Sequence, residues 1–346
     1  MCGIFGAING SSVTQSLLTG LESLSYRGYD SAGIAVVGEQ GMQRRRSQGK
    51  LNNLELALKN SPINGTIGIA HTRWATHGAP NKRNAHPHMT PKVAVAHNGI
   101  IENYQALRNE LNSAGYQFQS DTDSEVIPLL ITRFLDQGME HGQAMRAAIN
   151  ALDGSFAIAA VFPDKPDMIL AARQGSPLVL GQAEGGYYLA SDANALATKA
   201  KMICHLEDGD LAYIGRERLD ITNPSNQPVN RMMHPIDIAE TDGGKQGYRH
   251  YMLKEIHEQP AVVTETLGGR LDEDGTAWLE DVHFDDEFAR DFDRLWITAC
   301  GTAYHAGLVG KEIFRRLLRI PTNVEYAHEM RYADPLVTSR NLTVAI

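Results

Sequence analysis

Cys2 is the residue of this chain best suited to covalent chemistry, and its position matters more than its type. Met1 is cleaved when the next residue is small, and its removal leaves Cys2 with a free α-amino group. That amine, with an ordinary pKa of about 7.7–8.0, can accept the thiol proton, so one residue supplies both nucleophile and base. Alternatively, Cys2 begins a buried strand, because free cysteines are among the most buried residues.

Two arginines lie in glycine-containing segments next to predicted strands. Arg27 belongs to YRGYDSAG (residues 26–33), where it could orient the loop of the nucleophile. Arg73 belongs to HTRWATHG (residues 71–78), and it offers the planar donor fork that a substrate carboxylate needs. The alternative is that both arginines form surface ion pairs and that Trp74 is a core side chain.

Two further polar segments predict an oxyanion hole and an ammonium site. In HNGIIEN (residues 97–103), the Asn98 side-chain amide and the Gly99 backbone N–H are donors that can converge on an oxyanion. In SDTDSE (residues 120–125), Asp123 could pair with a substrate ammonium, so that with Arg73 it would recognise an amino acid at both charged ends. The alternatives are a turn at residues 98–99 and helix N-caps at Asp121 and Asp123.

A metal site is the competing interpretation of five histidines: His71, His77, His86, His88 and His97. Pro87 separates two of them, and no Cys or carboxylate has a ligand-like spacing to the others. We therefore expect no metal.

The composition predicts a soluble protein of about two domains. The chain has 346 residues, of which 42% are hydrophobic and 21% charged. No segment approaches the roughly 20 apolar residues of a membrane span, and the N-terminus lacks the basic flank of a signal peptide. Three scattered cysteines, Cys2, Cys204 and Cys300, agree with a reducing compartment. We therefore expect a cytoplasmic protein without a membrane partner.

The net charge of −9 argues against a nucleic-acid partner, because such binding uses clusters of Lys and Arg. The one local exception is the run of arginines at positions 44–46. We interpret this run as a solvated strand edge.

Periodicity in the first 220 residues or so predicts a sheet-rich α+β domain. The predicted strands are residues 33–37, 67–72, 93–97, 155–162, 168–172 and 210–214. The predicted helices are residues 14–24, 104–114, 124–135 and 143–152. Residues 223–247 contain six prolines and glycines with little periodicity, and this composition predicts a linker.

A parallel α/β unit is predicted after a long helix at residues 250–267. It consists of a strand (295–299), a glycine turn at Cys300-Gly301-Thr302, a helix to residue 318 and a second strand (322–326). The chain ends in another apolar run, so we expect a second domain that is incomplete.

The chain closely resembles the glutamine–fructose-6-phosphate aminotransferase (isomerizing) family, the glucosamine-6-phosphate synthases. The resemblance is carried by MCGI at the N-terminus, the segments 26–33, 71–78 and 98–103, YRHYM at 248–252, KEI at 254–256, EQP at 258–260 and ACGT at 299–302. The resemblance covers the whole chain. It implies a class II glutaminase domain of the N-terminal-nucleophile (αββα) type at 1–222, a linker at 223–247 and part of a sugar isomerase (SIS) domain at 248–346.

The resemblance also implies roles for individual residues. Cys2 would be the nucleophile and base, and Asn98 with Gly99 the oxyanion hole. Glutamine would be bound by Arg73, Thr76, His77 and Asp123, whereas Trp74 would gate ammonia. Ammonia would pass to fructose 6-phosphate without a metal or organic cofactor, in a homodimer or higher oligomer.

Two departures from the family bear on the second domain. Ala303 stands where the family often has serine, and the chain stops at Ile346, before the serine-rich sugar-phosphate loop. Thr302 is a candidate phosphate contact, because a hydroxyl at a turn that opens a helix suits an anion. We expect Cys300 to be a buried thiol at a strand end.

Two alternative functions remain open. One is another class II amidotransferase, such as amidophosphoribosyltransferase, which lacks the ACGT segment. The other is a catalytically incomplete chain that acts only as a glutaminase or as a sugar-phosphate-binding module.

Overall fold

The computed structural model describes residues 2–74, 78–236, 247–268, 270–271, 291–333 and 335–346. By its internal contacts the chain divides into two compact units, Met1–Gly244 (unit 1) and Lys245–Ile346 (unit 2).

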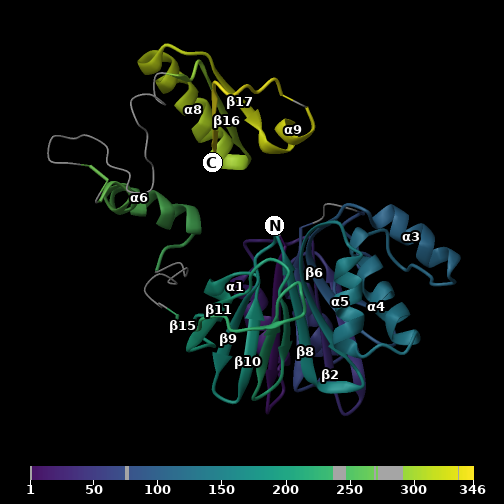
Figure 1. The fold of residues 1–346 in the computed structure, drawn as a ribbon. Helices are drawn as coiled ribbons and strands as arrows, with labels where there is room; N and C mark the ends of the chain where they lie inside the picture. Colours follow the sequence, from purple (N-terminus) through teal and green to yellow (C-terminus); the bar gives the residue numbers. More distant parts are fainter. Residues whose placement is uncertain (1, 75–77, 237–246, 269, 272–290, 334) are drawn as a thin grey trace. The chain divides into compact units, whose positions relative to one another are not determined.

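Unit 1 is built on two antiparallel sheets (Figure 1). The strands of the first sheet, in spatial order, are β15 (His234–Pro235), β11 (Met202–His205), β9 (Val179–Ala183), β10 (Gly186–Ala190), β1 (Gly3–Asn9), β4 (Ile67–Arg73), β2 (Ser31–Gly38) and β3 (Gly41–Gln48). Those of the second sheet are β14 (Pro228–Val229), β13 (Leu219–Thr222), β12 (Leu211–Ile214), β8 (Lys165–Gln174), β7 (Gly154–Phe162), β6 (Ala94–Ile101) and β5 (His88–Met89).

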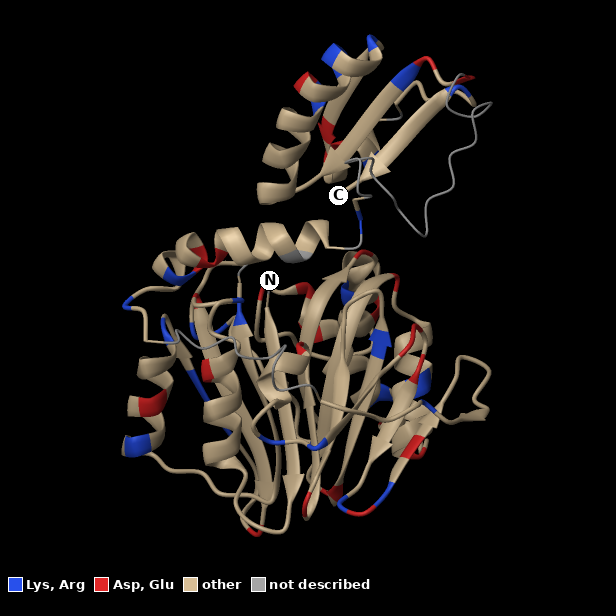
Figure 2. Cartoon of the chain, turned by 90° about the vertical axis from the view of Figure 1, so that its left-hand side faces the viewer, with Lys and Arg blue, Asp and Glu red and all other residues tan. Residues whose placement is uncertain are grey.

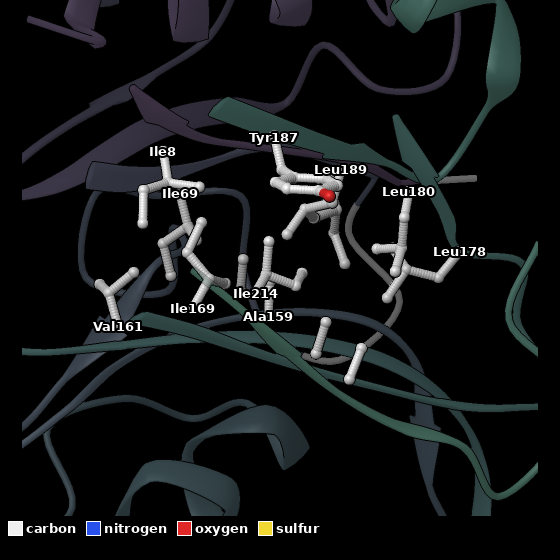
Figure 3. Packing of buried hydrophobic residues seen from close by; sticks show 14 of the residues in the cluster. Ile8, Ile69, Ala159, Val161, Ile169, Leu178, Leu180, Tyr187, Leu189 and Ile214 are labelled. Atoms are coloured by element: carbon white, nitrogen blue, oxygen red, sulfur yellow. The ribbon is translucent and has the colours of Figure 1, made fainter. Parts of the chain in front are cut away.

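A hydrophobic core lies between the two sheets. Figure 3 shows Ile8, Ile69 and Leu189 of the first sheet facing Val161 and Ile169 of the second. All five side chains are buried, and their alternation with residues of the opposite face follows from the two-residue period of a strand. Burial of this kind contributes about 25 cal/mol for each Å² of apolar surface removed from water.

Helices cover the outer face of each sheet. The first sheet packs against α1 (Thr14–Ser23) and α2 (Leu51–Asn60), whose leucines share a cluster with the outward residues of β1 and β2. The second sheet packs against α3 (Tyr104–Ser113), α4 (Val126–Asp136) and α5 (His141–Asn150). Two short 3₁₀ helices are η1 (Asp123–Glu125) and η2 (Ala193–Leu196). The resulting order, helices, sheet, sheet, helices, is the αββα sandwich that the resemblance implied.

Every strand and helix predicted in unit 1 is present, with boundaries that differ by a few residues. The predicted linker is partly wrong, because β14 and β15 extend the edges of the two sheets within residues 223–236. Arg231 lies between these strands and pairs with the fully buried Asp210, with its Nη2 at 2.8 Å from Oδ1. This segment is therefore anchored to unit 1 by backbone pairing and by an ion pair.

The expectation of a solvated arginine run is also wrong in part. β3 is the edge strand predicted from that run, but its Arg44 and Arg46 side chains bend back over the sheet. Arg44 Nη1 donates to the carbonyl oxygen of Pro87 at 3.1 Å, and Arg46 Nη1 donates to that of Ala85 at 2.6 Å. In Figure 2 acidic and basic segments are interspersed along unit 1.

Unit 2 contains a parallel three-stranded sheet with the order β17 (Thr322–Tyr326), β16 (Arg294–Ala299) and β18 (Asn341–Ala345). Among its described residues, the helices are α6 (Tyr251–Leu267), α8 (Gly301–Leu318) and α9 (Ala327–Tyr332). α8 follows β16 directly, as the sequence predicts, and Gly307 of α8 packs on Ile297. Within the described ranges, no helix combines the length and the apolar character needed to cross a bilayer.

Candidate active site

Cys2 directly precedes the first residue of β1 and lies beside the last residues of the neighbouring strand β4. Cys2 Sγ accepts a hydrogen bond from the backbone N–H of Trp74 at 3.2 Å, and the carbonyl oxygen of Trp74 lies 3.4 Å away. Gly3, which pairs with Thr72, has no room for a side chain, because a Cβ there would lie 2.7 Å from Thr72 Oγ1. The close pairing of β1 with β4 therefore places the thiol against the backbone of Trp74.

The Cys2 thiol needs a base if it is to react at neutral pH. Burial raises the pKa of this thiol, and the Trp74 backbone hydrogen bond, the charge of the N-terminus and Arg73 oppose that rise without cancelling it. The thiolate is the nucleophilic form of cysteine. An α-amino group on Cys2 itself would supply the base without any histidine.

The two predicted oxyanion donors lie on β6, on the opposite sheet. Asn98 Nδ2 donates to the carbonyl oxygen of Cys2 at 3.1 Å, which brings the side-chain amide to the nucleophile across 96 residues of sequence. Gly99 has φ of +126°, and a Cβ there would lie 1.9 Å from the carbonyl oxygen of Ser155. Only glycine fits this backbone position. Asn98 and Gly99 are therefore part of a strand, and the alternative of a turn is wrong.

Arg73 and Asp123 form an oppositely charged pair of groups around the thiol. Arg73 is 4% exposed, and its guanidinium donates to the carbonyl oxygens of Gly78 at 3.2 Å and Ala79 at 3.3 Å. Burial lowers the pKa of Arg73, whereas the charges of Cys2 and Asp123 raise it. A free amino acid carries the complementary charges, a carboxylate and an ammonium.

Asp123 is bound to β6 rather than to a helix end. Its Oδ2 accepts from the backbone N–H of Ile101 at 2.9 Å, and the cap position of η1 is occupied by Thr122. The N-cap alternative is therefore wrong for Asp123. Its negative charge also raises the pKa of the Cys2 thiol, which places the carboxylate within electrostatic range of the nucleophile.

Arg27 forms an ion pair, as the structural alternative predicts, but this pair is largely buried. Arg27 Nη2 lies 3.1 Å from Asp192 Oδ2, and Nη1 donates to the carbonyl oxygen of Ser191 at 3.2 Å. Ser191 in turn accepts at its Oγ from the backbone N–H of Ile4 at 3.0 Å. Through Ser191, Arg27 therefore stabilises β1 at Ile4, two residues after Cys2.

The comparisons with known proteins match this chain to glutamine amidotransferases. A family model described as a glutamine amidotransferase domain matches residues 71–198. The glutamine–fructose-6-phosphate aminotransferase (isomerizing) of Rhizobium leguminosarum bv. viciae is 44% identical over 350 residues, covering 100% of this chain and 57% of the relative. The corresponding enzyme of Mesorhizobium japonicum is 46% identical over 335 residues, which cover 96% of this chain and 55% of that relative. The chain is a homologue of these aminotransferases. It spans a little over half of their length.

A solved structure supports the fold alone. The glutamine phosphoribosylpyrophosphate amidotransferase from B. subtilis matches with a TM-score of 0.59 at 21% identity, over 93% of this chain and 65% of that one. Unit 1 thus has two stacked antiparallel sheets, and residues 71–198 within it match the glutamine amidotransferase domain model.

Three residues with roles implied by the aminotransferase resemblance follow β4 in the sequence. Trp74 is 44% exposed, so it is not the core side chain of the alternative reading, and its ring contacts Tyr29 edge-on at 5.5 Å. Thr76 and His77 lie outside the described residues. Their predicted contacts with glutamine stay predictions.

The residues expected to act in unit 2 lie at the turn between β16 and α8. Thr302 is exposed in the first turn of α8, where a helix N-terminus can accept an anion. Cys300 is exposed rather than buried, which corrects the sequence-based expectation, and its Sγ lies 3.7 Å from His328 Nδ1. The reason is that Cys300 is the N-cap of α8, beyond the last residue of the strand.

Four of the five candidate metal ligands are instead packed against one another behind Asn98: His71, His86, His88 and His97. Their rings are in edge-to-face contact, at 4.1 Å between His71 and His86 and 4.5 Å between His86 and His88. Burial lowers the pKa of His71 to about 3 and that of His97 to about 4. In the part of the chain that the structure describes, no group of three or more His, Cys, Asp or Glu is arranged to hold a metal.

Sequence reasoning assigned no role in catalysis to these histidines. His71 is two residues before Arg73 in β4, and residues at this spacing face the same side of a sheet. That spacing was the available signal that His71 points toward the site.

Proposed function

We propose that unit 1 is a glutaminase that hydrolyses L-glutamine to glutamate and ammonia through a thioester on Cys2. The observation that carries this proposal is the contact of Asn98 Nδ2 with the backbone of Cys2, which places a donor beside the thiol. After removal of Met1, the α-amino group takes the thiol proton, and Sγ attacks the side-chain amide carbon. Asn98 and the Gly99 N–H stabilise the oxyanion that forms.

The remaining steps balance without a cofactor or a metal. The tetrahedral intermediate collapses as the C–N bond breaks, and the amine group leaves as ammonia with the proton held by the α-amino group. Water then attacks the thioester, which releases glutamate and restores the thiol. Arg73, Thr76 and His77 hold the glutamine carboxylate end in this scheme, and Asp123 holds its ammonium.

We further propose that ammonia is used for the synthesis of glucosamine 6-phosphate from fructose 6-phosphate. The homology to glutamine–fructose-6-phosphate aminotransferases favours this acceptor over phosphoribosyl pyrophosphate. Unit 2 would be the first part of the SIS domain, with Thr302 near the sugar phosphate and Trp74 gating ammonia. Because the chain spans 57% of the relative, synthesis and homo-oligomer formation are proposed for the full-length enzyme, in the cytoplasm.

The decisive experiment is glutamate release from glutamine, measured for the wild-type chain and for Cys2→Ala, with loss of Met1 verified by intact mass. We expect release by the wild type and none by the variant. Cys204→Ala is the matched control, because Cys204 is a buried thiol in β11 and its loss should leave release intact. Equal release by the wild type and Cys2→Ala would overturn the assignment.

The acceptor is tested separately by adding fructose 6-phosphate. Binding without glucosamine 6-phosphate formation would favour the alternative of a glutaminase or sugar-phosphate-binding module. Formation of glucosamine 6-phosphate by this chain would show that it suffices for synthesis.

A further inference from the structure

The hydrogen bonds of His71 determine which of its ring nitrogens carries a proton. His71 Nε2 lies 2.9 Å from the carbonyl oxygen of His97 and 3.0 Å from Asn98 Oδ1. The Asn98 amide is oriented by Cys2, whose carbonyl oxygen can only accept and therefore faces the NH₂ group. Both neighbours of His71 Nε2 are thus acceptors. The network assigns the proton to Nε2.

A second histidine maintains this tautomer. Burial lowers the pKa of His71 to about 3, so the ring is neutral near pH 7 and its Nδ1 must accept. His86 Nδ1 lies 3.2 Å from His71 Nδ1 and is placed to donate. The carbonyl groups on either side of His86 accept from Arg44 and Arg46 of β3. Arg44 and Arg46 therefore fix the backbone on both sides of His86, whose Nδ1–H keeps the proton of His71 on Nε2.

We infer that His71 is a positioning residue of the oxyanion hole: its single N–H, shared between the His97 carbonyl and Asn98 Oδ1, holds the Asn98 amide with its NH₂ group toward Cys2. The catalytic role of this orientation rests on the proposed glutaminase function, whereas the orientation itself rests only on the hydrogen bonds. Without the donor on His71, only the Cys2 carbonyl oxygen holds the amide in this orientation. An amide that turns over presents its oxygen to the developing negative charge, which repels it.

The orientation is tested without any measurement of activity. In the full chain with ¹⁵N-labelled histidine and asparagine, long-range ¹H–¹⁵N spectra should show His71 protonated at Nε2 and bare at Nδ1. The Asn98 side-chain NH₂ signals should be protected from solvent exchange in the wild type and lose that protection in His71→Leu. A proton on His71 Nδ1, or unchanged Asn98 protection in the variant, would overturn the inference.

The contribution of this orientation to catalysis is tested with a double-mutant cycle on glutamine hydrolysis. His71→Leu should lower kcat about 10- to 100-fold with KM for glutamine nearly unchanged, and His71→Gln, which keeps a side-chain N–H, should recover part of the loss. In an Asn98→Ala background, His71→Leu should cause no further loss of kcat, because its effect passes through Asn98. A full additional loss in that background would indicate a merely structural effect and overturn the inference.

His88→Leu is the matched control for burial. His88 belongs to the same cluster, but its Nε2 is bonded to Thr122 Oγ1 at 3.0 Å and not to Asn98. Its effect on kcat should therefore be the same in the wild-type and Asn98→Ala backgrounds. A wild-type chain that releases no glutamate would count against the proposed function, whereas the tautomer and exchange results would still decide the orientation.

Discussion

Lowering the pH below about 6.5 should destabilise unit 1, because four buried histidines must stay neutral for it to stay folded. Burial lowers the pKa of His71 to about 3 and of His97 to about 4, and those of His86 and His88 well below the ordinary 6.5. The unfolded chain therefore binds more protons than the folded one. Stability is fully present above about pH 6.5 and is lost as the pH falls toward these folded-state values.

The size of the effect follows from proton linkage. A histidine that stays neutral in the folded state and has an unfolded pKa of 6.5 lowers the free energy of unfolding by about 2 kcal/mol at pH 5. The four histidines together therefore lower it by about 8 kcal/mol. Whole domains are stable by only about 5–15 kcal/mol. We therefore expect the urea midpoint of unit 1 to fall steeply between about pH 6.5 and pH 5.

Native-state hydrogen exchange of peptides from β6 and β7, measured across a urea series, reports unit 1 specifically. His88→Gln removes one titrating group, so its stability should fall less steeply than that of the wild type, by about 1.2 kcal/mol per pH unit between pH 6 and pH 5. Thr122→Val, which removes the same hydrogen bond without removing a titrating group, should keep the wild-type slope. Identical slopes in the wild type and His88→Gln would refute the reasoning.

The remaining predictions concern backbone space and a buried charge. Gly99→Ala, with its Cβ 1.9 Å from the Ser155 carbonyl oxygen, should destabilise unit 1 by more than about 3 kcal/mol, whereas Gly115→Ala, at φ +90° with nothing within 4 Å, should cost about 1 kcal/mol. Equal urea midpoints for the two variants would contradict this. Arg231→Leu should destabilise by about 3 kcal/mol, because it leaves the fully buried Asp210 without its 2.8 Å partner. Calorimetry should show that adding Asp210→Asn restores much of the loss; if it restores nothing, the cost lies in packing.

The sequence alone was sufficient for the local features of this protein. The two-residue period of the strands and the leucine spacing of α1 depend on neighbours within one element, so they could be predicted from residue types. Cys2 was predicted as the nucleophile from its position, Arg73 and Asn98 from their place at strand ends, and Asp123 from its place in the polar segment 120–125. The resemblance to the aminotransferases likewise rests on linear motifs.

The tertiary structure decided which of those residues meet. Asn98 reaches Cys2 across 96 residues and Ser191 reaches Ile4 across 187, through strand register that no local pattern encodes. The edge pairing of β14 and β15 in a stretch that has the composition of a linker likewise depends on exposed edges that only the assembled sheets provide. The protons on the buried histidines were beyond sequence reasoning for the same reason. A histidine's tautomer and pKa are set by burial and by partners distant in sequence, and both exist only once the two sheets have packed.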